Sequence, residues 1–372
     1  MKKIRVLNII GGLERGGAET FIVNVYRNIN KELFEFDFAI YDKPSGEGYY
    51  DEILEMGAQV YFIPKKSRGI IRSLYHINKL VNRENYDVIW RHGSGALALL
   101  DLEAAKGRNR LLVFHSHNSE EKGLGRILHG LLCRYFNKKE YIVRFACGEK
   151  AGKYFYGNRK FNVIKNGISL KNFVYDINKR NEIRDRYELT NKYVIGHIGR
   201  LVEQKNQLFL IKIFAELCKI REDLILIIVG DGKLRTELQT YAVKKNISEK
   251  VLFFGVIENI NEIACAFDLF AMPSIYEGFP VALVEMQALG ITCLVSDNID
   301  REVDLTGNVR FLSLDDNILW VKEMIRSVES DKPYDELANG KIAEKGYDIA
   351  KTVEQIQSIF MNMLSNNKEN TD

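Results

Sequence analysis

Short apolar runs rich in β-branched and aromatic residues alternate with longer segments of helical period along almost the whole chain. This alternation is typical of βαβ units, in which parallel strands form a sheet and helices cover its faces. We expect helices between the strands. The predicted strands of the first half span residues 4–10, 36–41, 60–63, 87–92, 111–117 and 141–147, and those of the second half span 192–199, 224–230, 251–255, 268–274 and 292–296.

A polar stretch over residues 166–181 interrupts the alternation, so we place a domain boundary near residues 166–175. At 372 residues the chain is too long for one ordinary core and suits two domains. The predicted fold class is α/β, with two Rossmann-like domains that each hold a doubly wound parallel sheet. The predicted domains span 1–168 and 169–346, a late helix over 347–364 either packs back on the first domain or caps the second, and residues 365–372 form a disordered tail.

Composition and charge exclude several classes of protein. Hydrophobic residues make up 46% of the chain, as in a folded globular protein. A net charge of +3 argues neither for nor against nucleic acid by itself, and we expect no such partner. The five cysteines stand singly, without the spacing of a metal site or a disulfide framework. The basic start leads into a strand rather than a signal peptide, and no run approaches the roughly 20 apolar residues that cross a bilayer, so we expect a cytoplasmic protein.

Ligands of doubly wound domains bind at the loops that follow the carboxyl ends of the strands. The first such loop reads "GGLERGGAET". It matches neither the dinucleotide-binding GxGxxG pattern nor a P-loop. The loop either lies against a bound ligand or only forms a tight turn between a strand and a helix. Four glycines of this loop let the backbone pass close to a ligand, namely Gly11, Gly12, Gly16 and Gly17.

A second loop, "GRLVEQKNQ", begins with Gly199 at the end of a predicted strand. Arg200 and Lys205 bracket the loop, and a forked guanidinium with a point-charge ammonium suits the oxygens of a diphosphate. Solvated surface charges are the alternative interpretation. A third loop, "VGDGKLRTEL", carries Gly230 between a strand and a helix, as many unrelated α/β proteins do.

The stretch "SIYEGFPVALVEM" at 274–286 places Glu277 in a loop and Glu285 early in the helix that follows. Pro280 suits the first turn of that helix, because its ring fixes φ and its missing N–H would have no partner there. The helix start presents free N–H groups and a partial positive charge, which attract phosphate.

Two histidines stand at the end of the predicted strand 111–117, in the stretch "FHSHNSE". Because they lie two residues apart, His115 and His117 point to the same face of the sheet and form a possible metal pair. No third ligand is indicated nearby. We therefore expect no metal site and prefer a substrate contact for His117, with a purely structural histidine as the alternative.

The segment over residues 123–144 is apolar at helical spacing and basic along one rim. Such a helix, expected over 124–140, binds an anionic membrane surface or packs on a core with ordinary surface charges. The sequence leaves both open. The apolar positions are Leu124, Ile127, Leu128, Leu131, Leu132, Tyr135 and Phe136, and the basic ones are Arg126, Arg134, Lys138 and Lys139.

Together these motifs resemble the retaining glycosyltransferases of family 4, which have the GT-B fold, over nearly the whole chain. Glu277-Gly-Phe-Pro followed by Glu285 is similar to the Glu-x7-Glu motif of the family. "GGLERGGAE", "GRLVEQKN" and "KNGIS" are similar to its first glycine loop, its Gly-Arg-Leu…Lys-Asn motif and the entry to its second lobe. Ser169 departs from the usual aspartate of that last motif, which affects the hinge rather than the activity. "HSHN" and "SDNIDREVDLTGNVRFLSL" resemble the exopolysaccharide and capsule branch.

The resemblance implies a nucleotide-sugar donor, expected to be a UDP-sugar, held mainly by the second lobe. Arg200 and Lys205 would neutralise the diphosphate, Glu285 would accept hydrogen bonds from the ribose, and Glu277 with His117 would hold the transferred sugar. The backbone from Phe279 to Val281 would donate N–H groups to phosphate or sugar. The remaining donor-binding positions that it implies are Gly11, Gly12, Gly16, Gly199, Gly230, Gly278 and Pro280.

By the same resemblance, the reaction retains the anomeric configuration and needs no metal or cofactor. The acceptor is expected to be a saccharide or a polyprenyl-linked saccharide bound by the first lobe, at the inner face of the cell membrane. Two other functions stay open: a nucleotide-sugar 2-epimerase of the same fold, and a two-lobed sugar-binding protein without catalysis.

Overall fold

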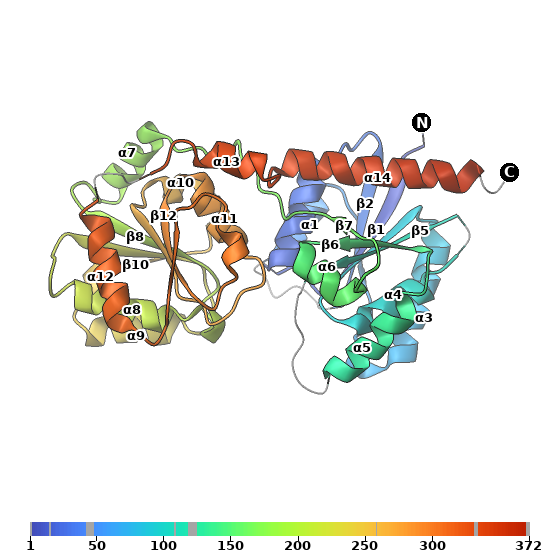
Figure 1. Cartoon of the computed structure of the whole chain (residues 1–372), viewed down its shortest axis with the longest axis horizontal. Helices are drawn as coiled ribbons and strands as arrows, with labels where there is room; N and C mark the ends of the chain where they lie inside the picture. The colour runs from blue at the N-terminus through green and yellow to red at the C-terminus, as the bar shows by residue number, and fades with distance from the viewer. Residues whose placement is uncertain are drawn as a thin grey trace. The chain divides into compact units, whose positions relative to one another are not determined.

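The computed structural model describes residues 2–14, 16–41, 48–107, 109–117, 125–257, 259–330 and 334–369. The chain divides into two compact units (Figure 1). We call them the N-lobe, which comprises Met1–Gly167 and Ile349–Asp372, and the C-lobe, which comprises Ile168–Asp348.

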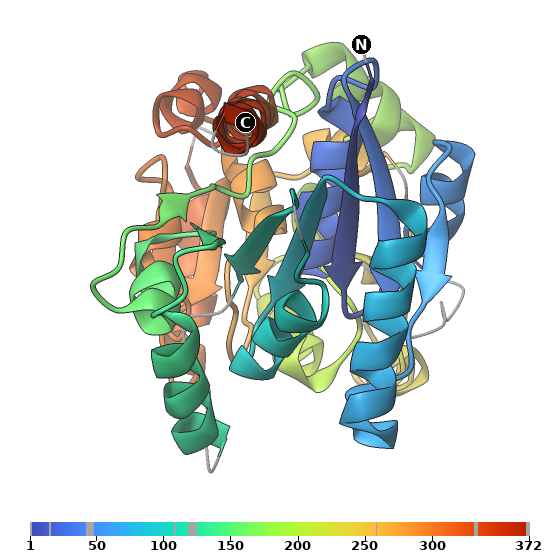
Figure 2. The ribbon, with the colours of Figure 1, turned by 90° about the vertical axis from the view of Figure 1, so that its right-hand side faces the viewer.

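The N-lobe contains a seven-stranded parallel sheet in the order β3-β2-β1-β4-β5-β6-β7. Figure 2 shows its blue and teal strands side by side, with the light-blue helix α3 in front of them. The strands are β1 (Ile4–Ile10), β2 (Phe34–Ile40), β3 (Val60–Phe62), β4 (Val88–Gly93), β5 (Leu111–Ser116), β6 (Ile142–Ala146) and β7 (Asn162–Val163). The helices are α1 (Gly17–Asn28), α2 (Tyr50–Glu55), α3 (Ile70–Glu84), α4 (Leu99–Ala104), α5 (Gly125–Phe136), α6 (Glu149–Tyr156) and α14 (Ile349–Glu369).

Apolar side chains line both faces of this sheet, because successive residues of a strand point to opposite sides. On β1, Val6 and Ile10 belong to a core under α1 and α14, whereas Leu7 and Ile9 belong to a second core under α3, α4 and α6. A parallel sheet covered on both faces explains why its strands read as nearly continuous apolar runs.

Helix α14 packs back on the N-lobe, although it follows the last strand of the C-lobe in the sequence. Its residue Phe360 is fully buried and contacts the rings of Phe34, Trp90 and Phe145. The helix therefore completes an aromatic core made by β2, β4 and β6.

The C-lobe repeats the plan with a six-stranded parallel sheet in the order β10-β9-β8-β11-β12-β13. Helices α8, α9 and α12 cover one face, and α7, α10, α11 and α13 cover the other. The strands are β8 (Tyr193–Ile198), β9 (Leu224–Val229), β10 (Val251–Gly255), β11 (Leu269–Met272), β12 (Thr292–Ser296) and β13 (Val309–Leu312). The helices are α7 (Ile177–Arg186), α8 (Gln207–Leu217), α9 (Arg235–Lys244), α10 (Ile260–Cys265), α11 (Val281–Ala288), α12 (Asn317–Val328) and α13 (Ala338–Glu344).

Each predicted strand corresponds to an observed one, and two observed strands were not predicted. Strand β7 has two residues and β13 has four, and both lie at a sheet edge, where short strands leave a weak pattern. The polar stretch 166–181 already contains the start of α7, where the Asp176 carboxylate accepts hydrogen bonds from the N–H groups of Asn178 and Lys179. No helix in the described part of the chain has the length and apolar character of a membrane span.

The strand order of each lobe reverses at one point, between β1 and β4 in the N-lobe and between β8 and β11 in the C-lobe. At such a point the connecting segments leave the sheet toward opposite faces, and the carboxyl ends of the two strands frame a crevice. The loops after β1, β4, β8 and β11 therefore border the two crevices in which a ligand can bind.

We predict that Phe360→Ala lowers the free energy of unfolding of the N-lobe by about 3–5 kcal/mol, because a large cavity opens between Trp90 and Phe145. Trp90 fluorescence in a Trp320→Phe background would follow N-lobe unfolding in urea. The neighbouring Met361→Ala change is the control and should cost less than about 0.5 kcal/mol, since Met361 is exposed. Equal effects of the two changes would contradict the packing of α14 on this core.

Candidate functional site

A largely buried ion pair joins the loops that follow β8 and β11. Lys205 Nζ lies 2.6 Å from Glu277 Oε1, and the two side chains are only 18% and 8% exposed. The strands end next to each other at the point where the sheet order reverses, which brings together residues 72 positions apart. The structure thus unites the predicted diphosphate-binding lysine with the predicted sugar-binding glutamate.

Backbone and amide hydrogen bonds hold the same two loops together. The N–H of Ile275 donates to the carbonyl oxygen of Gln204 at 2.8 Å, and the Gln204 side-chain amide donates to the carbonyl of Tyr276 at 2.9 Å. The Asn206 amide donates to the carbonyl of Pro273 at 3.2 Å. The two loops are therefore held together by these hydrogen bonds as well as by the Lys205–Glu277 ion pair.

Two buried side chains that the sequence did not single out support the start of the loop. The amide nitrogen of Gln207 lies 2.8 Å from the carbonyl oxygen of Arg200 and 3.1 Å from His197 Nε2, while His197 Nδ1 lies 2.9 Å from the carbonyl of Ala271. Burial lowers the pKa of His197 to about 4, so its ring is neutral, accepts at Nε2 and donates from Nδ1. His197 lies on β8 and could have been found as a polar residue inside an apolar strand.

Gly199 and Gly230 let the loops after β8 and β9 approach each other. Gly230 has a φ of +127°, and a Cβ there would lie 2.1 Å from the carbonyl oxygen of Gly199. Both the backbone conformation and the contact require glycine. These two predicted donor-binding residues thus shape the backbone beside Arg200 and Lys205.

The loop around Pro280 leads into helix α11 as expected, with two corrections. The helix begins at Val281, so Pro280 is its N-cap residue rather than part of the first turn. Since proline has no N–H, the donors of this stretch come from Phe279 and Val281 only. The ring of Phe279 stacks on that of Tyr347 with centroids 5.2 Å apart, which fixes the approach to the helix. Glu285 is partly buried within the first two turns of α11.

Arg200 and Gly278 lie at the surface of the C-lobe. The described residues offer the Arg200 guanidinium no hydrogen-bond or ion-pair partner, in contrast to Lys205. The carbonyl oxygen of Arg200 accepts a hydrogen bond from Gln207, and the exposed guanidinium is free to bind an anion.

The N-lobe has its own pocket at the point where its strand order reverses, with a volume of about 320 Å³. Gly11 after β1 and His92 on β4 line it, together with Glu19, Lys66 and His117. A Cβ on Gly11 would meet no atom within 4 Å, so this glycine leaves space rather than relieving a strained turn. Gly12 and Gly16 lie in the same loop but do not line the pocket, and none of the three has a positive φ.

A buried cluster of charges holds one wall of this pocket. Arg91 Nε lies 2.6 Å and Lys66 Nζ 2.7 Å from the carboxylate of Asp101, which is fully buried, and the Tyr41 hydroxyl donates to the same group at 2.7 Å. Two cations on one carboxylate leave the wall with an excess of positive charge. Asp101 lies on α4, outside every motif of the sequence, and no local pattern points to it.

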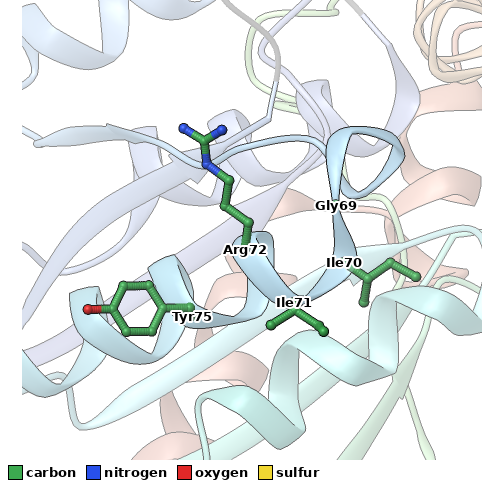
Figure 3. Close-up of a pocket in the computed structure, with 5 residues that line it drawn as sticks. All are labelled: Gly69, Ile70, Ile71, Arg72 and Tyr75. Atoms are coloured by element: carbon green, nitrogen blue, oxygen red, sulfur yellow. The ribbon is translucent and has the colours of Figure 1, made fainter.

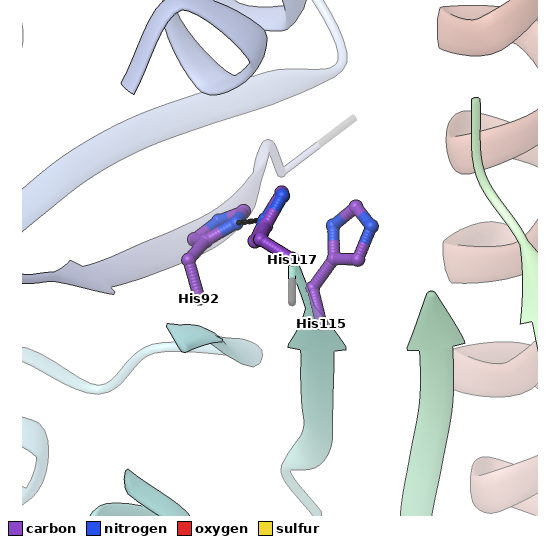
Figure 4. A group of neighbouring side chains, drawn as sticks. All are labelled: His92, His115 and His117. Carbon is purple, nitrogen blue, oxygen red and sulfur yellow. Dashed lines mark hydrogen bonds between the residues drawn. The ribbon is translucent and has the colours of Figure 1, made fainter. Parts of the chain in front are cut away.

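His117 follows β5 directly, and His92 from the neighbouring strand lies against it (Figure 4). The distance between His92 Nδ1 and His117 Nε2 is 3.1 Å. The expectation that His115 and His117 have no third nitrogen ligand nearby was therefore wrong. The missed signal was the histidine at the carboxyl end of the adjacent predicted strand.

Helix α5 exposes much of the apolar face that the sequence predicted, while Leu124 and the side chain of Arg126 lie outside the described residues. The helix turns His129, Cys133 and Phe136 toward the core, and Leu132 is partly buried. A second exposed apolar group lines an open pocket at the start of α3, where Ile71 is 86% exposed (Figure 3). The exposed residues of α5 are Ile127, Leu128, Leu131 and Tyr135.

The chain is similar to known proteins over nearly its full length. The sequence profile described as Glycosyl transferases group 1 matches residues 179–339, and that of Glycosyltransferase Family 4 matches residues 15–172. EpsF of Bacillus subtilis strain 168, assigned by name to the glycosyltransferases, is 33% identical over 96% of both chains. The UDP-Gal:alpha-D-GlcNAc-diphosphoundecaprenol alpha-1,3-galactosyltransferase of Escherichia coli is 27% identical over 98% of this chain and 97% of that protein.

Among solved structures, HepE of Anabaena in complex with UDP has the same fold. Its TM-score is 0.77 at 19% identity, and the match covers 97% of this chain and 100% of HepE.

We predict that Gly230→Ala destabilises the C-lobe more than Gly307→Ala does. Both glycines have a positive φ, so both changes should cost about 1–2 kcal/mol from the backbone conformation. A Cβ at residue 307 would meet no atom within 4 Å, whereas one at residue 230 would collide with the Gly199 carbonyl. Urea unfolding followed by Trp320 fluorescence measures the difference, and similar midpoints for the two variants would contradict the close contact.

Proposed function

Because the chain belongs to the family 4 glycosyltransferases of GT-B fold, we propose that it transfers a sugar, with retention, from a UDP-sugar to a saccharide or lipid-linked saccharide acceptor. The observation that carries this proposal is the buried contact of Lys205 with Glu277, beside the start of α11. It supplies a cation, a carboxylate and backbone donors within one lobe.

The leaving group explains why these groups stand together. Departure of the diphosphate is the hardest step of glycosyl transfer, since negative charge grows on the phosphate oxygens while positive charge grows on the sugar. Arg200 and Lys205 neutralise those oxygens, and the N–H groups of Phe279 and Val281 donate to phosphate or sugar hydroxyls. A preorganised donor of this kind is commonly worth about 3–4 kcal/mol. No metal is needed where fixed cations supply this stabilisation.

The two glutamates take different parts of the donor. Glu277, whose carboxylate is held by Lys205, accepts hydrogen bonds from hydroxyls of the transferred sugar near its anomeric carbon. Glu285 accepts hydrogen bonds from the ribose. The diphosphate helps to take the proton of the acceptor, which attacks the face that the leaving group vacates. The contact between His117 and the transferred sugar remains a prediction.

The relatives support the choice of substrates. The Escherichia coli relative is named for UDP-galactose as donor and for a diphosphoundecaprenol-linked sugar as acceptor. A relative from Staphylococcus aureus, 24% identical over 96% of this chain, is named for capsular polysaccharide biosynthesis. We therefore assign this chain to exopolysaccharide or capsule assembly, with the acceptor on the N-lobe.

A polyprenyl-linked acceptor requires the enzyme to work at a membrane surface, and α5 fits that task. Ile127, Leu131 and Tyr135 follow each other at intervals of four residues along the exposed side of the helix. Arg134 and Lys138 are exposed beside them. An apolar stripe with a basic rim binds anionic lipid headgroups. We propose that α5 holds the protein at the inner face of the cell membrane.

The decisive experiment combines ligand binding with turnover. UDP and UDP-sugars should raise the melting temperature of the protein, because a ligand that binds only the folded state stabilises it, and GDP should do so less. Lys205→Ala, Arg200→Ala and Glu277→Ala should each lower transfer at least about tenfold, a loss of more than about 1.4 kcal/mol. Consumption of the donor without acceptor, with a new nucleotide sugar formed, would instead indicate an epimerase.

Two controls separate chemistry from stability. Removing one partner of a buried ion pair costs about 3–5 kcal/mol, so single variants lose stability as well as activity. The double variant Lys205→Met/Glu277→Leu leaves no unpaired charge and should recover much of the stability but not UDP binding. Lys233→Ala removes an exposed lysine from the same lobe and should change neither. UDP binding by the folded double variant would refute the diphosphate assignment.

Membrane binding has its own test. The protein should sediment with vesicles that contain anionic lipid, and binding should weaken as salt is added. The variant with three charges removed from α5 and the turn after it should bind at least about threefold more weakly, whereas removal of three exposed C-lobe charges should have little effect. Equal binding to neutral and anionic vesicles would exclude this role for α5. The first variant changes Arg134, Lys138 and Lys139 to Gln, and the control changes Lys219, Lys244 and Lys245 to Gln.

A further inference from the structure

Three of the six histidines of the chain gather at the carboxyl ends of β4 and β5 (Figure 4). His92 and His115 are directly paired in the parallel register of the two strands, and His117 follows two residues later on the same face. One nitrogen of each ring lies within 4.8 Å of one nitrogen of each of the others. Strand pairing alone brings His92 next to His115 and His117, which follow it by 23 and 25 positions in the sequence.

The nitrogens of these rings are buried and mostly unpaired. Both nitrogens of His115, Nε2 of His92 and Nδ1 of His117 have no hydrogen-bond partner among the described residues. His115 is fully buried against aromatic rings: it stacks on Trp90 and meets the edge of Phe21. A buried polar atom without a partner costs about 1–3 kcal/mol, so an apolar residue at this position would give a more stable core. The cluster retains nitrogens that the fold itself does not use.

The rings are in the state that metal binding requires. Burial favours the neutral form of these rings, because charging an imidazole away from water costs free energy. Neutral imidazoles keep a lone pair, and they are the commonest nitrogen ligands of zinc, copper and nickel.

The distances fit a tetrahedral ion. Two ligand nitrogens, each about 2.0–2.1 Å from zinc, lie about 3.3 Å apart in tetrahedral geometry. His92 Nδ1 and His117 Nε2 are 3.1 Å apart, so this pair already has the required spacing. All three ligand nitrogens lie within 4.8 Å of one another, so the third nitrogen has to approach the other two by up to about 1.5 Å when an ion binds.

We propose that His92, His115 and His117 form a site for a divalent transition metal, with zinc as the ion that fits best. The proton that the His92–His117 pair shares moves to the outer nitrogen of its own ring, so that both inner nitrogens can coordinate. The fourth position faces the pocket of the N-lobe, which His92 and His117 line together with Glu19. That pocket gives the ion a path to the site and leaves room for a water ligand.

A metal bound at this site would affect the proposed transferase function, and the inhibition described here rests on that proposed function. An ion bound here occupies Nε2 of His117, and the other ring nitrogen, Nδ1, is buried, so a bound ion removes His117 from the role proposed for it. Zinc should then inhibit transfer, and a chelator should restore it. The site would serve as a reversible inhibitory site rather than as part of the reaction.

The test uses the full chain without a polyhistidine tag. Titration with zinc, followed by calorimetry and by metal analysis after dialysis, should give one equivalent bound with a dissociation constant in the micromolar range. Cobalt should give the visible spectrum of a tetrahedral nitrogen site. His92→Gln and His117→Gln should each weaken binding at least about tenfold. These readouts do not depend on transferase activity, so they can succeed where the proposed function fails.

Two further variants keep the test decisive. His115→Phe retains the aromatic packing against Trp90 and removes the two unpaired nitrogens, so it should fold, melt at the same or a higher temperature, and lose metal binding. His76→Ala removes an exposed histidine from α3 and should bind as the unchanged chain does. Absence of saturable binding, or full binding by the folded His115→Phe variant, would show that the three rings form only a buried hydrogen-bonded group.

Discussion

The ion pair between Lys205 and Glu277 is the constraint on which the C-lobe site depends. Exposed pairs in the same lobe, such as Lys233 with Glu203, are screened by water and contribute little. Lys205 and Glu277 are largely buried, so neither charge is tolerable without the other. The pair therefore joins the loops after β8 and β11, together with the hydrogen bonds between them, and any anion that binds Lys205 also interacts with the carboxylate of Glu277. Stability and the proposed chemistry rest on the same two atoms.

The fold makes this pairing possible because the strand order of the sheet reverses between β8 and β11. Two loops that leave a sheet in opposite directions frame a crevice, and the hydrogen bonds of Gln204 and Asn206 keep its walls together. The N-lobe uses the same geometry between β1 and β4 for another set of groups. There, Arg91 and Lys66 hold Asp101, and His92 meets His117. Each lobe thus concentrates its polar residues where a doubly wound sheet leaves space.

Helix α5 shows where a linear pattern misleads. Its apolar residues were expected to share one face, which would lie either on a membrane or on the core. The helix instead divides them, because His129, Cys133 and Phe136 make the inward contacts and leave Ile127, Leu131 and Tyr135 exposed. A histidine and a cysteine carry little weight in a hydrophobic pattern, although both are often buried in real cores. The pattern identified an amphipathic helix but could not say which apolar face the core takes.

The sequence by itself determined the two parallel sheets, all of their strands except β7 and β13, and the loops that carry Lys205, Glu277 and His117, because periodicity and turn residues act over a few positions. Only the tertiary structure decided which distant residues meet. Strand order placed Lys205 against Glu277 and His92 against His117, and neither contact has a local signal. The supporting roles of Gln207 and Asp101 likewise depend on their burial in the folded protein. Helix α14, at the end of the chain, completes a core whose strands come from its first half. Local preferences form the elements, whereas contacts between distant residues depend on how a sheet orders its strands.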